Sequence, residues 1–512
     1  MNDNPNKRLA KNTLVLYIRM AVMMLISFLT ARITLSVLGV SDYGINNVVG
    51  GLVSMFSLIS SSLSGCTGRF MSYALGKNDT KILSTTFCMS MNINIILALV
   101  CLLGIETLGL WFLNNKLVIP VDRLNTAFWV FQLSTVGFGL NLLSVPYNAT
   151  IIAYEKMSAF AYMTIFDAAA RLVIVLGIYY YKGDRLLLMS SLGLFVGVFR
   201  QFIIYVYCRR TFSACRYNLL WDKRYWKEMF AYAGWAYVGC SAGLLKDQGV
   251  NILINMFYDP TVNTARAISM QVRGIVGQFV GNFTIAMNPQ IIKEYASGNV
   301  MRMHSLIFRG ARFSFYLMFI LSLPIIFEIK GMLCIWLGQV PEHTVLFVRL
   351  VLVLSLLETV SNSLIVAQSA TGNIRDYQIV VGGIMLLNVP ISYILLRSGF
   401  FPEVTVCVAI VLSQFCLIGR LFFLRRMIRL SARAFLNQVY LNILFVSFCS
   451  MLLPMVLYIA LPEGALRFCL VCIGAIVSAS IMVYYIGCSS QERQMVLSYF
   501  VVAKNKLKSK HK

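Results

Sequence analysis

Two arginines and two polar residues share one stripe of a long apolar segment that runs from about residue 261 to 291. On a helical wheel Arg266, Arg273, Thr284 and Asn288 fall within roughly 60° of one another, with Gly277 between them. An arginine at the centre of a bilayer costs about 2.5–3.5 kcal/mol, so this stripe should face protein or water. A guanidinium presents a planar fork that suits phosphate oxygens, and the chemistry of the stripe is therefore anion binding.

Further polar side chains lie on this segment and the one before it. Gln278 belongs to a second polar line, roughly 120–160° round from Arg266, and Asn251 and Asn255 lie just upstream. The arginine pair has two open interpretations: the residues line a cavity, or they form structural ion pairs or interfacial anchors. We treat Asn251, Asn255, Thr284, Asn288 and, if the second line borders the same cavity, Gln278 as candidate polar contacts.

Other basic residues also interrupt apolar segments. Arg200, Arg349 and Arg420 are predicted near segment ends, where their charged heads would reach the membrane surface. Arg19, Arg32 and Lys246 lie deeper. Each of them has either a structural role or a place in a binding cavity, and we prefer the structural role.

Few acids interrupt the apolar segments. Asp167, Asp247 and Glu358 are the ones predicted deep enough for burial to affect their protonation. Asp247 follows Lys246 directly, so either the pair balances charge internally or Asp247 is a protonatable site that couples an ion gradient to movement. The same coupling hypothesis applies to Asp167 and Glu358.

Composition places these residues in a membrane. The 512-residue chain is 59% hydrophobic and 12% charged, whereas soluble domains carry about 25% charged residues. Thirteen cysteines are scattered mostly through apolar runs, a pattern of small buried hydrophobes and not of a disulfide framework. The chain is therefore predicted to be an all-α, polytopic membrane protein.

About fourteen segments are long enough to cross a hydrocarbon core of roughly 30 Å. A tight turn at Asp259-Pro260 is expected to start the arginine-bearing helix, and Pro289 to kink or end it. The predicted spans are 12–38, 45–71, 84–113, 124–145, 157–181, 186–208, 228–257, 261–291, 306–328, 343–369, 377–396, 404–424, 435–461 and 465–487.

Lysine and arginine are distributed unevenly between alternate loops. With the amino terminus in the cytoplasm, most of them fall in cytoplasmic segments, whereas few, such as Lys116, Lys182, Lys330 and Arg467, fall outside. An even number of spans with both termini cytoplasmic preserves this asymmetry. The net charge of +24 is thus mostly a topology signal, and it does not indicate a nucleic-acid partner.

The second span carries small and polar residues along one face, namely Asn47, Gly50, Ser54, Ser57, Ser61, Ser64 and Gly68. Such a face either packs closely against another helix or contacts a ligand. Tyr73-Ala74-x-Gly76 after this span matches Tyr295-Ala296-x-Gly298 after the eighth, a weak internal repeat. The repeat predicts an amino-terminal lobe with its linker over residues 1–221, a second lobe over 222–430, and two further helices with a basic tail over 431–512.

Several segments resemble bacterial polysaccharide flippases of the Wzx type, which export O-antigen or capsule repeat units. These flippases belong to the MOP (multidrug/oligosaccharidyl-lipid/polysaccharide) exporter superfamily, together with multidrug (MATE) exporters and lipid II flippases. The element LG-x-x-DYG from Leu38 to Gly44 is the most specific. The segments are NKRLAKNTLVLYIRM near the start, LGVSDYGINNVVGGLVSMFS, SVPYNATIIAYEKM, NTARAISMQVRGIVGQF and AMNPQIIKEYASG.

The resemblance implies a fourteen-helix, MATE-like fold of two six-helix lobes around a central cavity, with two C-terminal helices. It implies that sugar repeat units on undecaprenyl pyrophosphate are flipped by alternating access across the bacterial inner membrane. Membrane lipids and a polysaccharide polymerase machinery are the implied partners. Under this reading the arginines hold the pyrophosphate, and the amides and hydroxyls contact sugars.

Two rival functions remain. A MATE-type cation or drug antiporter would have the same fold but would be expected to present acids in its lumen. A membrane glycosyl polymerase would normally show a long periplasmic loop, which we do not find. No G-x-x-x-x-G-K-[ST] loop, nucleophile or metal-ligand cluster stands out, so the sequence predicts a transporter without cofactor, metal or enzymatic activity.

Overall fold

The structure is a computed structural model that describes residues 5–54, 56–115, 120–218, 220–258, 260–337, 340–490 and 492–494. Several predictions fall on residues outside these ranges: the turn residue Asp259, the loop residue Lys116 and the basic tail from residue 495. The side chains of Asn47, Ser54 and Ser57 are likewise outside the description.

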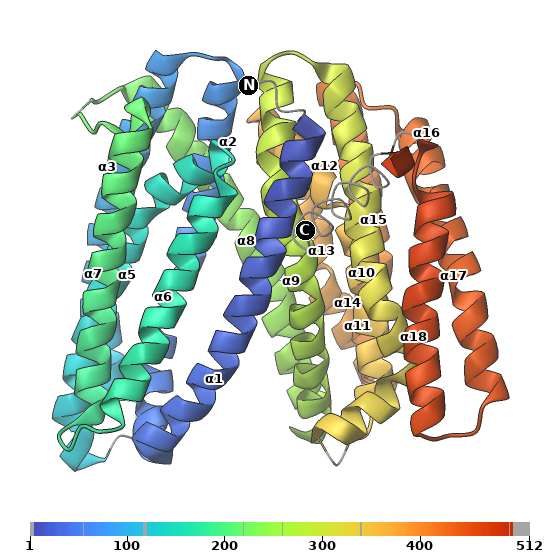
Figure 1. The fold of residues 1–512 in the computed structure, drawn as a ribbon, viewed down its shortest axis with the longest axis horizontal. Helices are drawn as coiled ribbons and strands as arrows, with labels where there is room; N and C mark the ends of the chain where they lie inside the picture. Colours follow the sequence, from blue (N-terminus) through green and yellow to red (C-terminus); the bar gives the residue numbers. More distant parts are fainter. Residues whose placement is uncertain are drawn as a thin grey trace, which may run out of the picture. The chain divides into compact units, whose positions relative to one another are not determined.

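The described residues form helices and no strand (Figure 1). In chain order the α-helices are α1 Pro5–Ser54, α2 Ser57–Gly76, α3 Thr80–Gly104, α4 Leu110–Asn115, α5 Leu124–Ala153, α6 Met157–Ile178, α7 Arg185–Thr211, α8 Lys223–Phe257, α9 Pro260–Ala296, α10 Val300–Leu337, α11 Thr344–Thr359, α12 Asn362–Thr371, α13 Arg375–Leu386, α14 Asn388–Arg397, α15 Val404–Ile428, α16 Ala432–Phe435, α17 Leu441–Ala460 and α18 Ala465–Met482.

Among the described residues, eleven helical stretches are long and apolar enough to cross a membrane by length and composition. Of the other three predicted spans, 228–257 lies in α8 and 261–291 in α9, whereas 45–71 runs from the end of α1 into α2. These segments carry Lys246–Asp247, the arginine stripe and the serine face, and such polar residues make them less apolar than the eleven. The sequence-predicted arrangement of about fourteen spans is confirmed.

Local signals explain where several helices break. Gly39 interrupts α1 with φ 76°, a left-handed conformation that glycine adopts without steric cost, and it lies within the Leu38–Gly44 element. Pro260 begins α9, as expected for a residue without an amide donor. Pro289, by contrast, does not end α9: the helix continues to Ala296, so that part of the prediction was wrong.

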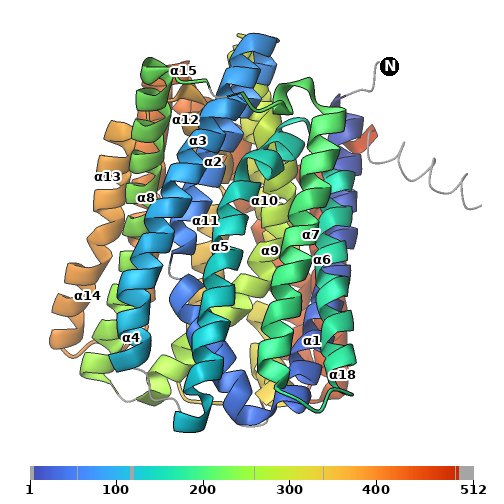
Figure 2. The same cartoon turned by 90° about the vertical axis from the view of Figure 1, so that its left-hand side faces the viewer.

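The chain forms two compact units. Unit 1 comprises residues 1–241, 285–300 and 369–379; in it α1 packs against α6, and α5 against α7, α2 and α3 (Figure 2). Unit 2 comprises 242–284, 301–368 and 380–512; in it α11 and α14 pack against α15, and α17 against α18. The division at residues 221 and 430, which followed the repeat, stays a prediction.

The two copies of the repeated motif meet inside unit 1. The rings of Tyr73 and Tyr295 have centroids 6.4 Å apart. A Cβ atom added at Gly76 would lie 2.6 Å from the carbonyl oxygen of Lys293 and 2.7 Å from the Cβ of Ala296. Only glycine therefore permits α2 to approach the end of α9 this closely.

Candidate binding cavities in the two units

Unit 2 contains a cavity of about 270 Å³ that brings charged residues from four helices together. Its apolar wall comes mainly from α15. The charged and polar lining residues are Lys246, Asp247, Arg273, Glu358, Asn362, Asn388, Ser413 and Arg420. Sequence analysis predicted four of them, Lys246, Asp247, Arg273 and Glu358, as site residues.

Glu358 of α11 organises the charges of this cavity. Its Oε2 accepts a hydrogen bond from Arg273 Nη2 at 2.6 Å, and its Oε1 lies 3.5 Å from Lys246 Nζ. Lys246 Nζ also lies 3.7 Å from Asp247 Oδ1. The internal charge balance suggested for Lys246 and Asp247 thus extends to Glu358 and Arg273, which brings two bases and two acids into contact.

Arg266 occupies a different environment from Arg273, although both lie on α9. It is 6% exposed and does not belong to the cavity lining. Its Nε donates to Asn251 Oδ1 at 2.6 Å, and its Nη2 to the carbonyl oxygen of Asp247 at 3.4 Å. The structure therefore gives Arg266 a helix-bridging role between α9 and α8, and only Arg273 of the predicted pair faces the cavity.

The remaining polar candidates do not join this cavity. Asn255 and Gln278 are exposed, and the Thr284 hydroxyl donates to its own helix at the carbonyl oxygen of Val280, at 2.9 Å. Asn288 belongs to unit 1, where its Oδ1 is buried and has no hydrogen-bond partner. Gly277, between the stripe residues, faces open space.

Three arginines were misplaced by the sequence analysis. Arg420 is buried and lines the unit 2 cavity, and Arg200 lines a cavity of unit 1. Arg349 donates from Nε to the carbonyl oxygen of Ile326 at 2.9 Å. Arg200 and Arg420 thus reach a cavity, and Arg349, near the start of α11, reaches a backbone carbonyl of its own unit; these positions differ from the membrane-surface role that we expected.

Unit 1 contains a larger cavity of about 890 Å³ between α1, α5, α6 and α7. Asp167 of α6 lies on its wall, with Arg171 Nε 3.2 Å and Arg200 Nη1 3.9 Å from Oδ2. The second carboxylate oxygen of Asp167, Oδ1, is buried and has no hydrogen-bond partner among the residues that the structure describes. The coupling candidate Asp167 thus lines a cavity of unit 1, whereas the other two candidates, Asp247 and Glu358, line the cavity of unit 2.

Arg19 and Arg32 of α1 do not line this cavity. The guanidinium of Arg19 lies 4.9 Å from the ring centroid of Phe160, and within the described part of the chain its Nε and Nη1 have no hydrogen-bond partner. Arg32 is exposed. Both the structural interpretation preferred for these two residues and the alternative of substrate binding stay predictions.

The residues of the small-residue face predicted for the second span have different surroundings in the structure. Gly50 lines the unit 1 cavity, whereas Ser61 and Ser64 are exposed. The packing contact comes from a neighbour of that face, because the Ser62 hydroxyl donates to the carbonyl oxygen of Ala233 at 3.3 Å.

A buried ion pair of unit 1 escaped the sequence analysis. The carboxylate of Glu155 is fully buried and accepts from Lys293 Nζ at 2.7 Å and from Gln290 Nε2 at 3.2 Å. The backbone carbonyl of Glu155 accepts from Asn12 Nδ2 at 3.2 Å. Glu155 lies in the turn between α5 and α6 and has φ 58°. A turn glutamate followed by lysine looks solvated in sequence, so no local signal distinguished it.

Asp184 caps α7 in the loop that precedes it. Its Oδ1 accepts from the amides of Leu186 and Leu187, and its Oδ2 accepts from the Thr126 hydroxyl at 2.6 Å. Arg123 Nη1 lies 3.2 Å from the same Oδ2. Burial favours the protonated acid, but the bonds from Thr126 and the amides, with the charge of Arg123, hold the pKa of Asp184 below its ordinary value.

No protein-family model and no curated protein matches this chain. Solved structures do match. A crystal structure of a MATE protein in complex with MaD3S has a TM-score of 0.70 and 12% identity and covers 84% of this chain and 97% of its own. An outward-facing multidrug resistance MATE family transporter of the MOP superfamily has a TM-score of 0.69 and 12% identity over the same shares.

A MOP superfamily transporter from Pyrococcus furiosus, described as having a binding pocket of reverse polarity that suggests a different function, has a TM-score of 0.69. It is 11% identical and covers 85% of this chain and 97% of its own. At such identities the likeness establishes the fold: an all-helical, polytopic membrane fold of the MATE type.

Proposed function

We propose that this protein is a membrane exporter of a substrate with an anionic phosphate headgroup, namely an oligosaccharide repeat unit on undecaprenyl pyrophosphate. The observation that carries the proposal is the charge of the unit 2 cavity. Lys246, Arg273 and Arg420 line it against Asp247 and Glu358, so bases outnumber acids by three to two. An excess of positive charge in a low-dielectric cavity attracts an anion.

Glu358 would compete with the substrate's phosphate for the cations Arg273 and Lys246. It holds Arg273 Nη2 at 2.6 Å and lies near Lys246, so it satisfies both cations when no anion is bound. Phosphate oxygens offer the same acceptor geometry to the guanidinium fork. A bound pyrophosphate would displace Glu358 from Arg273, and the freed carboxylate would then be available to take up a proton.

Polar groups beside these charges suit a sugar. Asn362, Asn388 and Ser413 line the same cavity and supply amide and hydroxyl partners. Arg266 holds Asn251 and thereby α8 against α9, so it positions Lys246 and Asp247 without contacting the substrate. The polyprenyl tail needs no aqueous path and remains in the bilayer while the headgroup crosses.

The test is transport in proteoliposomes of a fluorescent sugar on polyprenyl pyrophosphate, scored by the fraction that a membrane-impermeant quencher reaches. Arg273→Ala should abolish most transport, whereas Arg273→Lys should impair it partially, because lysine keeps the charge but loses the fork. Arg397→Ala, an exposed basic residue at the end of α14, is the matched control. A well-expressed Arg273→Ala variant with normal transport would refute the proposal.

A second function, export of cations or drugs by a MATE-type antiporter, is favoured by the solved structures of similar fold. It is also favoured by Asp167, whose Oδ1 is buried in the unit 1 cavity without a hydrogen-bond partner. Efflux of a cationic dye from the same proteoliposomes, lost in Asp167→Asn, together with an absence of lipid transport, would establish this function instead.

The proposal also includes a location in the bacterial inner membrane with both termini in the cytoplasm, in company with the polysaccharide polymerase machinery. Single cysteines introduced at Lys182, Lys330 and Arg467 should react with an impermeant thiol reagent from outside. Labelling from inside at two of these positions would contradict the topology, because successive loops alternate between the two sides.

A further inference from the structure

A separate pocket of unit 1 lies where α7 ends and the linker to α8 passes over α3 and α5. Its volume is about 570 Å³, and none of its lining residues belongs to the Asp167 cavity. The lining comprises Met91 and Ile95 of α3, Leu143 and Tyr147 of α5, Gln201, Tyr205 and Arg209 of α7, and Cys215, Arg216, Tyr217 and Asn218 of the linker.

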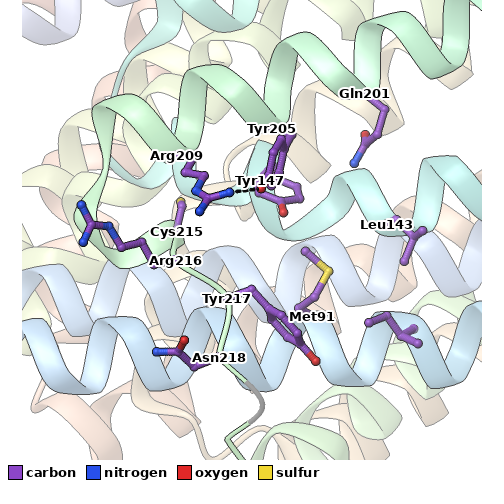
Figure 3. Close-up of a pocket in the computed structure, with 11 residues that line it drawn as sticks. Met91, Leu143, Tyr147, Gln201, Tyr205, Arg209, Cys215, Arg216, Tyr217 and Asn218 are labelled. Carbon is purple, nitrogen blue, oxygen red and sulfur yellow. Dashed lines mark hydrogen bonds between the residues drawn. The ribbon is translucent and has the colours of Figure 1, made fainter.

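The charges of this pocket are all positive. Arg209 and Arg216 line it, and the lining includes no acid. Arg209 Nη1 donates to the hydroxyl of Tyr205, and neither arginine forms an ion pair within the part of the chain that the structure describes. Figure 3 shows both arginines toward one end of the pocket, with Leu143 and Gln201 at the other.

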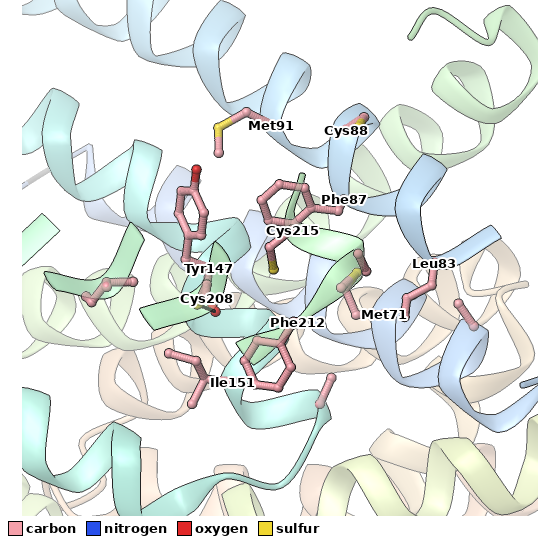
Figure 4. Packing of buried hydrophobic residues seen from close by; sticks show 14 residues of the cluster. Met71, Leu83, Phe87, Cys88, Met91, Tyr147, Ile151, Cys208, Phe212 and Cys215 are labelled. Atoms are coloured by element: carbon pink, nitrogen blue, oxygen red, sulfur yellow. Dashed lines mark hydrogen bonds between the residues drawn. The ribbon is translucent and has the colours of Figure 1, made fainter. Parts of the chain in front are cut away.

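The linker that walls the pocket is held in place by its own contacts. Phe212 and Cys215 are buried in the hydrophobic cluster that α3, α5 and α7 form (Figure 4). The Tyr217 hydroxyl donates to Asn92 Oδ1 at 2.7 Å, and Asn92 Nδ2 donates to the carbonyl oxygen of Leu220 at 3.0 Å. The pocket is therefore preformed, and a ligand need not order the linker in order to bind.

Apolar surface continues from the pocket along the same two helices. Leu99 on α3 and Val198 and Phe202 on α7 are large and exposed. Arg209 and Tyr217 line the pocket where α7 ends, and basic and aromatic residues of this kind mark the headgroup level of a membrane. The site thus offers cations at headgroup level and an apolar track toward the hydrocarbon core.

We propose that this pocket binds an anionic phospholipid such as phosphatidylglycerol. Its phosphate would lie between Arg209 and Arg216, and its acyl chains along Met91, Ile95 and Leu143 and the exposed apolar track. A free phosphate ion would use only the arginines and would leave the apolar half of the lining uncovered. A zwitterionic lipid would bring a positive headgroup to a site that has no acid to receive it.

The experiment is native mass spectrometry of the full-length protein in detergent, titrated with phosphatidylglycerol, with phosphatidylcholine and with inorganic phosphate. Arg209→Gln and Arg216→Gln should each weaken phosphatidylglycerol binding roughly fivefold, and the double variant about 30-fold, from the usual contribution of a basic residue to anionic-lipid binding. Arg210→Gln is the matched control, since Arg210 is adjacent and exposed but does not line the pocket.

Folding of each variant is checked by its melting temperature without added lipid, and Arg209→Lys/Arg216→Lys should restore most of the binding. We expect phosphatidylglycerol to bind the wild type and Arg210→Gln with the same affinity. We also expect the wild type to bind phosphatidylglycerol much more tightly than phosphatidylcholine. Equal binding of the two lipids, unchanged binding in a folded double glutamine variant, or equal binding of inorganic phosphate would each overturn the proposal. The readout does not involve transport, so it is independent of the proposed substrate.

Discussion

Replacing Lys293 by methionine is expected to destabilise unit 1 far more than neutralising its partner Glu155. Breaking a buried ion pair by removing one member costs about 3–5 kcal/mol, because the other charge stays buried. The Glu155 carboxylate is 0% exposed but keeps the hydrogen bond from Gln290, so we expect the lower end, about 3 kcal/mol, for Lys293→Met.

The opposite change should cost less for two structural reasons. The Lys293 side chain is 23% exposed, so its ammonium can turn toward water once the carboxylate is gone. Glutamine at 155 also retains an oxygen for Gln290 and Lys293, and it occupies the same positive φ without new strain. We therefore expect about 1 kcal/mol for Glu155→Gln, the size of one hydrogen bond.

The double variant separates pairwise coupling from the effects of the single changes. Glu155→Gln/Lys293→Met should cost about 2 kcal/mol, less than the sum of the single changes, because no charge is then left unpaired. The free energy of unfolding is measured by titration of the purified protein with SDS in mixed micelles. Lys156→Met, a change at an exposed neighbouring lysine, should have no effect. A Glu155→Gln variant less stable than Lys293→Met would refute the reasoning.

Three further predictions concern the other features described. Arg273→Ala should reduce transport severely at unchanged expression, whereas Arg266→Ala should instead lower the amount of folded protein, which immunoblots of membrane fractions would show. Gly76→Ala should lower the melting temperature, because its new Cβ would lie 2.6 Å from the Lys293 carbonyl oxygen; an unchanged melting temperature would contradict the close approach. Asp184→Ala should cost about 1 kcal/mol at neutral pH, as for a lost helix cap. Because the folded-state pKa of Asp184 is lowered, its contribution is present above its unfolded value of about 3.9 and is lost as pH falls through the lower folded value; the variant should therefore unfold with a weaker dependence on pH in that acidic range.

The spans could be predicted because bilayer crossing imposes length and apolarity on each segment separately. Polar helices were found as well, since α9 shows its arginine stripe without reference to any other helix. A helical wheel does not predict the partner of a residue on another helix. Arg266 and Arg273 share a stripe, but Arg266 contacts Asn251 and Arg273 contacts Glu358. Positions along one helix do not define the neighbours that pack against it.

Two misjudged sites illustrate the same limit. Arg420 was assigned to a span end from the length of its apolar run, yet the neighbouring helices enclose it and make it part of a cavity. Glu155 sits in a short turn whose composition suggests solvent, and only the approach of α9, more than a hundred residues later, buries it. Long-range burial of this kind has no counterpart in local periodicity.

The contact between the two copies of the repeated motif shows that matching residues can serve different purposes. Tyr73 and Tyr295 meet each other, but the two glycines that follow them do not have equivalent surroundings. Gly76 permits a close helix approach, whereas Gly298 has open space around it and a φ of 81°. One glycine is therefore required for the side chain that it lacks, and the other for the backbone conformation that it can adopt.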